Sequence, residues 1–510
     1  MPCSDPKGDP KGAPQHLLRG RGQEGEWYPF AGLTLHRAAW VLPISSPVIR
    51  DGIVAVQDGM ILEAGPAKAM LKEYAPSRGG IPTVLLDHGD GTILPSLVNT
   101  HTHLELSCLA GRACTEAGFV GWIKNLIRAR EGCSSEEFEA GILSAIRELH
   151  QRGTGLVGDV SNTGGSIIPL RESALAGRVF LEAIGFQYQK EAENWKFIQS
   201  ILNSQLHSQL DSQSSSQATS QPTSQPTSQP ISQSISHSSS QPTSQPTLPS
   251  TFQSSSQSTS YPASLPNVYS PPERGVRVCL AAHAPYSVSS RYLQLLLQFL
   301  QKDPLWLDQP FSIHVAESKD ESIFLSTAGG EIRQFLIDRG GWDPDWIPPQ
   351  TTPVQYLFQQ GILGAHTICV HAVQVCDQDI EILARTRSKV CICPRSNHAL
   401  AVGLAPVEKF LQKGISVSLG TDSLASNTSL CLWQEMFFLK NALPSLSSQQ
   451  ILKMATLSGA LALGEKGFGS IEAGKYASLI FLPITAPSAS KIEDAVVLEG
   501  QEKEVRWISQ

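Results

Sequence analysis

Short apolar runs rich in β-branched residues recur along the chain, separated by stretches in which apolar residues have helical spacing. Near-continuous apolar strands that alternate with helices are typical of a parallel sheet covered on both faces. Eight such units predict an α/β fold, a TIM-type (β/α)8 barrel. The runs are ILPSLVNTH, GTGLVGDVS, RVFLEAIGF, VRVCLAAHA, FSIHVAE, TICVHAV, KVCICPRS and ISVSLGTDS.

Polar residues gather at the C-terminal ends of these runs. In a barrel of parallel strands all these ends meet at one mouth, which is where the chemistry of such barrels takes place. We therefore expect the polar residues to surround a common site. They are His101, His103, Asp159, His283, His314, His371, Ser396 and Asp422.

Two flanking segments follow a different pattern and lie outside the predicted barrel. Residues 30–90 contain alternating strands broken by Asp-Gly turns, and residues 467–510 contain a further strand pattern. Together they predict a small β-sandwich domain built from both termini. The catalytic barrel is then made of residues 91–202 and residues 271–466.

A low-complexity insert interrupts the predicted barrel. Residues 203–270 are dominated by Ser, Gln, Thr and Pro in repeats such as SQPTSQPT, with almost no apolar side chains to bury. Such a segment cannot offset its ordering entropy, so we expect disorder there, and also in the tail of residues 1–29. Because the insert follows the helix after the third strand, it should leave from the face opposite the site, as a tolerated linker.

Composition favours small-molecule chemistry. The formal net charge is −7 and the pI is near 6.0, with no basic block, so a nucleic-acid partner is not expected. The N-terminus lacks the apolar region of a secretory signal, and no apolar run is long enough to suggest a membrane span. The ten cysteines contain no CxxC pair, and Cys391 and Cys393 fit a buried strand better than a metal site. These features predict a cytoplasmic protein.

Four of the strand-end residues form a candidate metal site. His101 and His103 are two positions apart, so both imidazoles point to the same side of a strand. His314 ends the fifth strand and Asp422 ends the eighth. Nitrogen ligands with one carboxylate suit zinc or iron(II), and open coordination positions are typical of catalytic sites. We expect a divalent metal, Zn²⁺ in preference to Fe²⁺, that lowers the pKa of a bound water toward about 7 and supports hydrolysis.

A candidate proton-transfer group follows the fifth strand. Glu317 lies three residues after His314, where the chain turns over the barrel mouth. A carboxylate there can accept a proton from the activated water and deliver it to a leaving nitrogen. His371 and His283 are then placed to polarise and contact a substrate. HxH, HxxE and TDS in this order, each at the end of a barrel-type strand, argue against a merely structural role.

These motifs resemble those of the amidohydrolase superfamily, in the branch that holds cytosine, guanine and S-adenosylhomocysteine deaminases and the triazine chlorohydrolases. The resemblance covers residues 30–507 apart from the insert, and its motifs are PSLVNTHTHLELS, HAPYSVS, SIHVAES, CPRSNHAL and VSLGTDSLASN. It implies one metal ion, with Glu317 as proton shuttle and His371 stabilising the tetrahedral adduct. Binuclear members carry a carboxylated lysine at the end of strand four, where this chain has His283. The ligands that the resemblance implies are His101, His103, His314 and Asp422, the last also catalytic.

Finer likeness implies a purine substrate. HTHLELS, GFVGWIKNLIRAR and GTDSLASN are similar to sequences of aminodeoxyfutalosine deaminases, which implies a 6-aminopurine nucleoside of the aminodeoxyfutalosine, adenosine or S-adenosylhomocysteine type. In S-adenosylhomocysteine deaminases a glutamate nine residues after a tryptophan contacts the ribose, and Trp122 and Glu131 have this spacing. A surface-helix position beside Arg128 and Arg130 fits Glu131 equally well. By the same resemblance His283 contacts the purine ring. Further candidate substrate contacts are Glu105, Ser396 and Asn397.

Two positions depart from the family pattern, and two other functions stay open. Ser96 stands where a turn glycine is usual, and Ser478 stands where an aspartate is common. Neither belongs to the candidate metal site, so they bear on turn geometry and subfamily. The alternatives are a chlorohydrolase or amidase acting on another nitrogen heterocycle, and a non-catalytic small-molecule-binding barrel. The sequence also leaves open whether the chain forms a homodimer.

Overall fold

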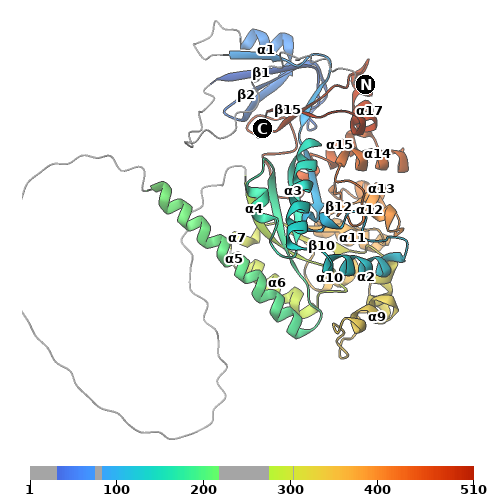
Figure 1. The fold of residues 1–510 in the computed structure, drawn as a ribbon. Coiled ribbons are helices and arrows are strands. Elements are labelled where there is room, and N and C mark those ends of the chain that lie inside the picture. The colour runs from blue at the N-terminus through green and yellow to red at the C-terminus, as the bar shows by residue number, and fades with distance from the viewer. Residues whose placement is uncertain (1–31, 75–82, 218–274, 303, 510) are drawn as a thin grey trace, which may run out of the picture. The chain divides into compact units, whose positions relative to one another are not determined.

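The computed structural model describes residues 32–74, 83–217, 275–302 and 304–509. It has two compact units, of which the first combines residues 1–195 with residues 276–510 and the second comprises residues 196–275. The barrel strands and a separate sheet lie in the first unit. Figure 1 shows the fold as a ribbon.

Eight parallel strands form the predicted barrel. Their order is β13-β12-β11-β10-β9-β8-β7-β6, so neighbours in the sheet are neighbours along the chain. The barrel is nearly closed by a parallel bridge between Thr102 and Asp422, and the backbone nitrogens of Thr421 and Asp422 both donate to the carbonyl of His101. The strands are β6 (Leu97–Thr102), β7 (Thr154–Ser161), β8 (Ala176–Ala183), β9 (Val276–Ala282), β10 (Phe311–Val315), β11 (Thr367–His371), β12 (Lys389–Ile392) and β13 (Val417–Leu419).

Helices connect successive barrel strands, as the alternating pattern predicts. Helix α3 shows how the local sequence sets a helix start, because Ser134 and Glu137 form a reciprocal capping box at its N-terminus. The helices from β6 to the end of the barrel are α2 (Gly118–Glu131), α3 (Ser135–Gln151), α4 (Ile167–Arg171), α5 (Tyr188–Gln217), α6 (Ser290–Lys302), α7 (Pro304–Leu307), α8 (Lys319–Thr327), α9 (Gly330–Asp338), α10 (Pro353–Gln359), α11 (Asp377–Thr386), α12 (Pro394–Ala399), α13 (Val407–Gln412), α14 (Leu432–Ala442), α15 (Ser448–Met454) and α16 (Leu457–Ala462).

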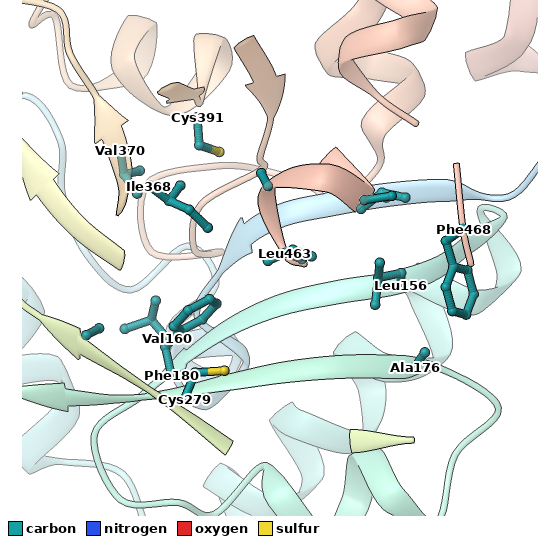
Figure 2. Packing of buried hydrophobic residues seen from close by; sticks show 14 of the residues in the cluster. Leu156, Val160, Ala176, Phe180, Cys279, Ile368, Val370, Cys391, Leu463 and Phe468 are labelled. Carbon is teal, nitrogen blue, oxygen red and sulfur yellow. The ribbon is translucent and has the colours of Figure 1, made fainter. Parts of the chain in front are cut away.

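The barrel interior is filled by side chains of its own strands. Buried residues of β6, β7, β8, β9, β11 and β12 belong to one apolar cluster, together with Leu463 and other residues that follow β13 (Figure 2). Strands that are not adjacent in a barrel can pack together only inside it, so this cluster marks the inward face of each strand. Cys391 and Cys393 are buried in it, as their apolar context predicts.

The segments that flank the barrel join in a second, mixed sheet of seven strands. Its order is β15-β14-β5-β1-β2-β3, with β4 also pairing with β1, so strands from both ends of the chain lie side by side (Figure 1). All seven strands belong to one continuous hydrogen-bonded sheet, and β2, β3, β5 and β14 all contribute side chains to one buried cluster. The elements are β1 (Leu33–Val41), β2 (Ile49–Gln57), β3 (Met60–Pro66), α1 (Ala67–Glu73), β4 (Thr83–Asp87), β5 (Thr92–Pro95), β14 (Leu479–Leu482), α17 (Ala489–Glu499) and β15 (Arg506–Ser509).

The two departures from the family pattern are partners in the structure. The hydroxyls of Ser96 and Ser478 are buried and lie 2.8 Å apart, and the backbone nitrogen of Ser96 donates to the carbonyl of Ser478 at 2.9 Å. A Cβ on Gly155 would lie only 2.3 Å from the Ser96 hydroxyl oxygen, so this glycine is needed for the close approach. The serine pair therefore joins the connection between β5 and β6 to the start of β14.

Helix α5 continues to Gln217, so it extends into the segment for which the sequence predicts disorder from residue 203 onward. The sequence gives a reason, because Leu202, Leu206 and Leu210 continue a four-residue apolar spacing. The rest of the predicted insert and the predicted N-terminal tail lie outside the described residues. Every helix in the described ranges is too short or too polar to cross a lipid bilayer.

Candidate metal centre and active site

The barrel mouth brings together the four residues that the sequence predicts as metal ligands. Nε2 of His314 lies 3.3 Å from Nε2 of His101. Oδ1 of Asp422 lies 3.7 Å from Nε2 of His101 and 3.6 Å from Nε2 of His103. All four side chains are buried. Their donor atoms belong to two groups that share His101, one with His103 and Asp422 and one with His314 and His371, each within 4.8 Å.

The spacing of these donors fits a divalent cation. Two ligands that each lie about 2.1 Å from one ion, at a tetrahedral angle, are about 3.4 Å apart, which is close to the separations between these atoms. Nδ1 of His314 lies 2.7 Å from the carbonyl oxygen of His283, to which it can donate its proton. The other ring nitrogen, Nε2, is then left as a lone-pair donor toward the centre.

Burial sets the protonation states that a metal requires. It lowers the pKa of His101, lowers the pKa of His103 to about 3, and holds the pKa of His314 well below its ordinary value. Burial would raise the pKa of Asp422, but the nearby imidazoles of His101, His103 and His371 hold it well below the usual range. Metals bind neutral imidazoles and ionised carboxylates, so the His/Asp cluster supports a divalent metal.

Two serines orient the Asp422 carboxylate. The hydroxyls of Ser396 and Ser426 donate to Oδ2 of Asp422 at 2.6 and 2.9 Å. Oδ1 is left to face the histidines. Ser396, a predicted substrate contact, thus binds the Asp422 oxygen that faces away from the histidines. Its contact with substrate stays a prediction.

Glu317 and His371 lie together beside the four predicted ligands. Oε1 of Glu317 lies 3.6 Å from Nε2 of His371, and Glu317, His371 and Asp422 offer donor atoms within 4.8 Å of one another. Nδ1 of His371 lies 3.1 Å from Oδ1 of Asn397, which fixes the ring with Nε2 toward Glu317. Burial raises the pKa of the Glu317 carboxyl well above its ordinary value, and the Asp422 charge adds to the effect. Asn397, a predicted substrate contact, therefore orients a ring of the site.

Unusual backbone conformations accompany these strand ends. Ala316, His371 and Asp422 have φ angles of 53°, 75° and 58°, in the left-handed region that non-glycine residues rarely adopt. Each lies where a barrel strand gives way to the loop over the mouth. Such conformations persist only where the surrounding structure holds them, and they cluster at functional sites.

Glu105 is fully engaged by the loop after β7. Its carboxylate accepts from the backbone nitrogens of Asn162 and Gly165, both at 3.0 Å, and from the hydroxyls of Ser161 and Thr163. These bonds fix the loop at the barrel mouth. The predicted contact between Glu105 and substrate stays a prediction.

Trp122 and Glu131 both belong to α2, but their nine-residue separation puts them on opposite faces of the helix. Nε1 of Trp122 donates to the carbonyl of Ala425 in the loop after β13 at 3.0 Å. Glu131 has a side chain that is 63% exposed, and its Oε1 lies 3.3 Å from Nη1 of Arg339. Of the two positions that the sequence left open for Glu131, this geometry matches the surface helix.

His283 takes the place expected for a group beside the metal ligands. Its ring centroid is 5.2 Å from that of His314, and its Nδ1 lies 2.5 Å from the hydroxyl oxygen of Ser287. Burial lowers its pKa to about 4, so the ring is neutral at physiological pH. A neutral ring held in this way presents Nε2 for a substrate contact, which stays a prediction.

Sequence reasoning missed Glu182, the next-to-last residue of β8, which lies at the same mouth. It is 3% exposed, and its Oε2 accepts from Nδ2 of Asn162 at 2.5 Å. Burial raises its pKa to about 8, although the Asn162 hydrogen bond opposes the effect. The available signal was a single acidic residue inside the apolar run RVFLEAIGF.

The model of the amidohydrolase family matches residues 92–503, which cover most of the chain. The chain belongs to the amidohydrolase family. The predicted resemblance is thus confirmed. Together with the eight parallel barrel strands, the match accounts for both the catalytic barrel and the return of the chain to the second sheet.

Curated relatives of this amidohydrolase include nucleoside deaminases. It is 35% identical over 232 residues to 5-methylthioadenosine/S-adenosylhomocysteine deaminase of Caldanaerobacter subterraneus, covering 44% of this chain and 48% of the relative. It is 27% identical over 453 residues to the enzyme of the same name from Nitratidesulfovibrio vulgaris, covering 86% of this chain and 81% of the relative. The matched region thus spans about half the length of the first relative.

Solved structures share the fold of this amidohydrolase. Helicobacter pylori aminofutalosine deaminase in complex with methylthio-coformycin superposes with a TM-score of 0.70 at 22% identity, covering 93% of this chain and 98% of that one. Atrazine chlorohydrolase from Arthrobacter aurescens TC1, complexed with zinc, gives a TM-score of 0.63 at 16% identity, with 91% of each chain covered. At these identities the likeness shows the fold.

Proposed function

We propose that this amidohydrolase is a metal-dependent hydrolytic deaminase of a 6-aminopurine nucleoside or a close analogue. The observation that carries the proposal is the cluster of three histidines and Asp422, whose donor groups overlap at His101, with Glu317 and His371 beside them. The deaminases among its relatives support the reaction type and the substrate class. An aminodeoxyfutalosine, adenosine or S-adenosylhomocysteine type of nucleoside fits this proposal.

The proposed metal ligands are His101, His103, His314 and Asp422. When bound there, a divalent metal acts as a Lewis acid and supplies an activated water as nucleophile. We assign Zn²⁺ before Fe²⁺, because three imidazoles and a carboxylate are a donor set common to zinc hydrolases. This assignment is the finer part of the proposal, since the donors alone suit both metals.

The side chains around the centre perform the proton transfers. Glu317 accepts the proton of the attacking water, and a raised pKa suits it to hold that proton and pass it to the departing amine. His371, oriented by Asn397 through Nδ1, is left with Nε2 as an acceptor, which stabilises the adduct by accepting a hydrogen bond from the hydroxyl that water forms on the purine carbon. His283 contacts the purine ring beside the reacting carbon.

The cellular setting of the proposed reaction is the cytoplasm. Nine cysteines of the described residues are free thiols, which is the state expected in a reducing compartment. The expected partner is the small-molecule substrate alone, with no role for nucleic acid or membrane.

A substrate panel tests the proposal. Ammonia release would be measured for adenosine, 5′-methylthioadenosine, S-adenosylhomocysteine and aminodeoxyfutalosine, with chloride release from atrazine measured in parallel. We expect ammonia from at least one nucleoside with kcat/KM of about 10⁴ M⁻¹s⁻¹ or more. Chloride release without ammonia would favour the chlorohydrolase alternative, and specific binding without turnover would favour a non-catalytic barrel.

A further inference from the structure

The barrel mouth holds a buried carboxylate that the proposed mechanism does not use. Glu182 is the next-to-last residue of β8 and pairs in register with Ala281 of β9, two residues before His283. Donor atoms of Glu182, His283 and His314 lie within 4.8 Å of one another. A group this close to the predicted metal and purine contacts lies within reach of a bound substrate.

Strand geometry places Glu182 on the inward face of the barrel. Side chains two positions apart share a strand face, and Phe180 belongs to the interior cluster (Figure 2). Cys279 and Ala281 belong to the same cluster, so His283 follows them on the inward face of β9. Glu182 and His283 therefore stand side by side above the apolar interior, at the level of the site.

Two side chains hold Glu182 in place from one side. Nδ2 of Asn162 donates to its Oε2 at 2.5 Å, and Oδ1 of Asn162 accepts from Nη1 of Arg130 at 3.0 Å. The backbone of Asn162 is itself fixed by Glu105, which accepts from its nitrogen at 3.0 Å. Residues of three segments thus orient the Glu182 side chain: Arg130 of α2, Asn162 after β7 and Glu105 after β6.

The other oxygen of this carboxylate has no hydrogen-bond partner among the described residues. Oε1 of Glu182 is buried and lies 3.7 Å from Nδ1 of His314, which is too long for a hydrogen bond. That nitrogen is 2.7 Å from the carbonyl of His283, and Nδ1 of His283 is engaged by Ser287. A buried acceptor without a donor is costly, so the missing donor is expected from a ligand.

We propose that Glu182 binds a sugar hydroxyl of the substrate through Oε1, with Asn162 as its positioning residue. This inference rests on the proposed function. The exocyclic amine of a 6-aminopurine nucleoside must face the metal centre in order to leave, so the remaining donors are the hydroxyls of the sugar. Buried carboxylates bind ribose hydroxyls in other nucleotide sites by the same chemistry. Glu182, rather than the exposed Glu131, is then the sugar-binding glutamate.

Deoxynucleosides test this assignment. kcat/KM would be measured for adenosine, 2′-deoxyadenosine and 3′-deoxyadenosine with the wild type, Glu182→Gln, Asn162→Ala and Glu131→Gln, and Glu139→Gln would serve as a control on the exposed surface of α3. Equilibrium binding of inosine and 2′-deoxyinosine, measured by calorimetry, gives a readout that does not depend on turnover. Metal content and thermal unfolding are recorded for each variant, because Glu182 is close to His314.

We expect the wild type to lose about 10- to 100-fold in kcat/KM on at least one deoxynucleoside, because the buried Glu182 carboxyl is then left without its hydrogen-bond partner. In Glu182→Gln the ratio between adenosine and that analogue should shrink to about threefold or less, with binding of inosine weakened by a similar factor. In Asn162→Ala the ratio of kcat/KM between adenosine and the deoxynucleoside should fall between those of the wild type and Glu182→Gln. Glu139→Gln should keep the wild-type ratio.

Three results would overturn the inference, and they differ from one another. If Glu182→Gln keeps metal and the full wild-type ratio, Glu182 does not bind the sugar. If Glu131→Gln alone loses the ratio, the sequence-based assignment of the ribose contact is correct. If the wild type releases ammonia from no nucleoside of the substrate panel and does not bind inosine, the proposed function itself fails.

Discussion

At the barrel mouth, the surroundings of two buried carboxylates, Asp422 and Glu317, shift their pKa values in opposite directions. Asp422 accepts two serine hydroxyls and faces imidazoles, so its pKa lies well below the usual range. Glu317 is buried with the Asp422 charge nearby, so its pKa lies well above its ordinary value. Groups whose environments separate their pKa values in this way commonly divide the roles of ligand and acid-base catalyst. The geometry thus favours Asp422 as ligand and Glu317 as proton carrier.

Replacing Glu317 by Gln tests this division at the residue scale. The substitution keeps the size of the side chain but removes its ability to carry a proton. We expect turnover to fall by roughly 10²–10⁴, because positioned acid-base groups contribute factors of this size. Metal content and substrate affinity should stay at wild-type levels, as measured by elemental analysis and by binding of a product nucleoside.

His103→Ala is the matched comparison for Glu317→Gln. Loss of a ligand should remove metal and activity together, whereas loss of the proton carrier should remove activity alone. Metal loss in Glu317→Gln would make Glu317 a ligand. Near-normal turnover with full metal content would remove the proton-transfer step on which the deaminase mechanism depends.

Residue identity predicts the centre of the site better than its surroundings. Each of the motifs HxH, HxxE and TDS lies at the end of a single strand, so its spacing can be recognised in the sequence. The structure brings the residues of the three motifs together. Glu105 and Ser396 form hydrogen bonds with loops distant in the chain, which no local pattern encodes. Glu182 was missed for the same reason, since its partner Asn162 belongs to a different strand end.

At the scale of elements, the connection between barrel and second sheet depends on the Ser96–Ser478 pair. We expect each single Ser→Ala change to lower the free energy of unfolding by about 1 kcal/mol, because it leaves one buried hydroxyl without its partner. The double variant should cost less than the sum, with a coupling of about 0.5–1.5 kcal/mol. Urea unfolding of the four proteins measures this cycle.

Turnover of the Ser96 and Ser478 variants is measured as a control. It should stay at the wild-type level, because neither serine belongs to the candidate site. Strictly additive single effects would show that the hydroxyl contact contributes nothing of its own. A large loss of activity at unchanged stability would instead show that this connection positions the metal ligands that follow on β6.

The sequence predicted the barrel strands, but it did not predict where helix α5 ends or how the strands of the second sheet pair. Six of the eight barrel strands fall within the apolar runs, and β6 and β8 extend past them by one and two residues. The agreement arises because both faces of a parallel strand are buried. The end of α5 at Gln217 was missed because Ser- and Gln-rich composition obscured the leucine spacing. Pairing of β1 with β4 and β5 in one sheet depends on contacts over long sequence separations.

At the scale of the whole molecule, we expect the low-complexity insert to be dispensable. A variant in which a short Gly-Ser linker replaces residues 218–270 retains α5 and every residue of the candidate site. Because the removed residues have almost no apolar side chains to contribute to a core, turnover should stay within about twofold of the wild type. Steady-state ammonia release and thermal unfolding check this, and an inactive or unfolded variant would contradict it.

The central claim is that one divalent metal at His101, His103, His314 and Asp422 drives deamination. Its most direct test is to prepare metal-free protein, add Zn²⁺ stepwise and measure ammonia release from the best nucleoside of the panel. Activity should rise from near zero in proportion to added metal and level off at about one equivalent per chain, as expected for one catalytic site. Full activity without metal, or a requirement for two equivalents, would contradict the account.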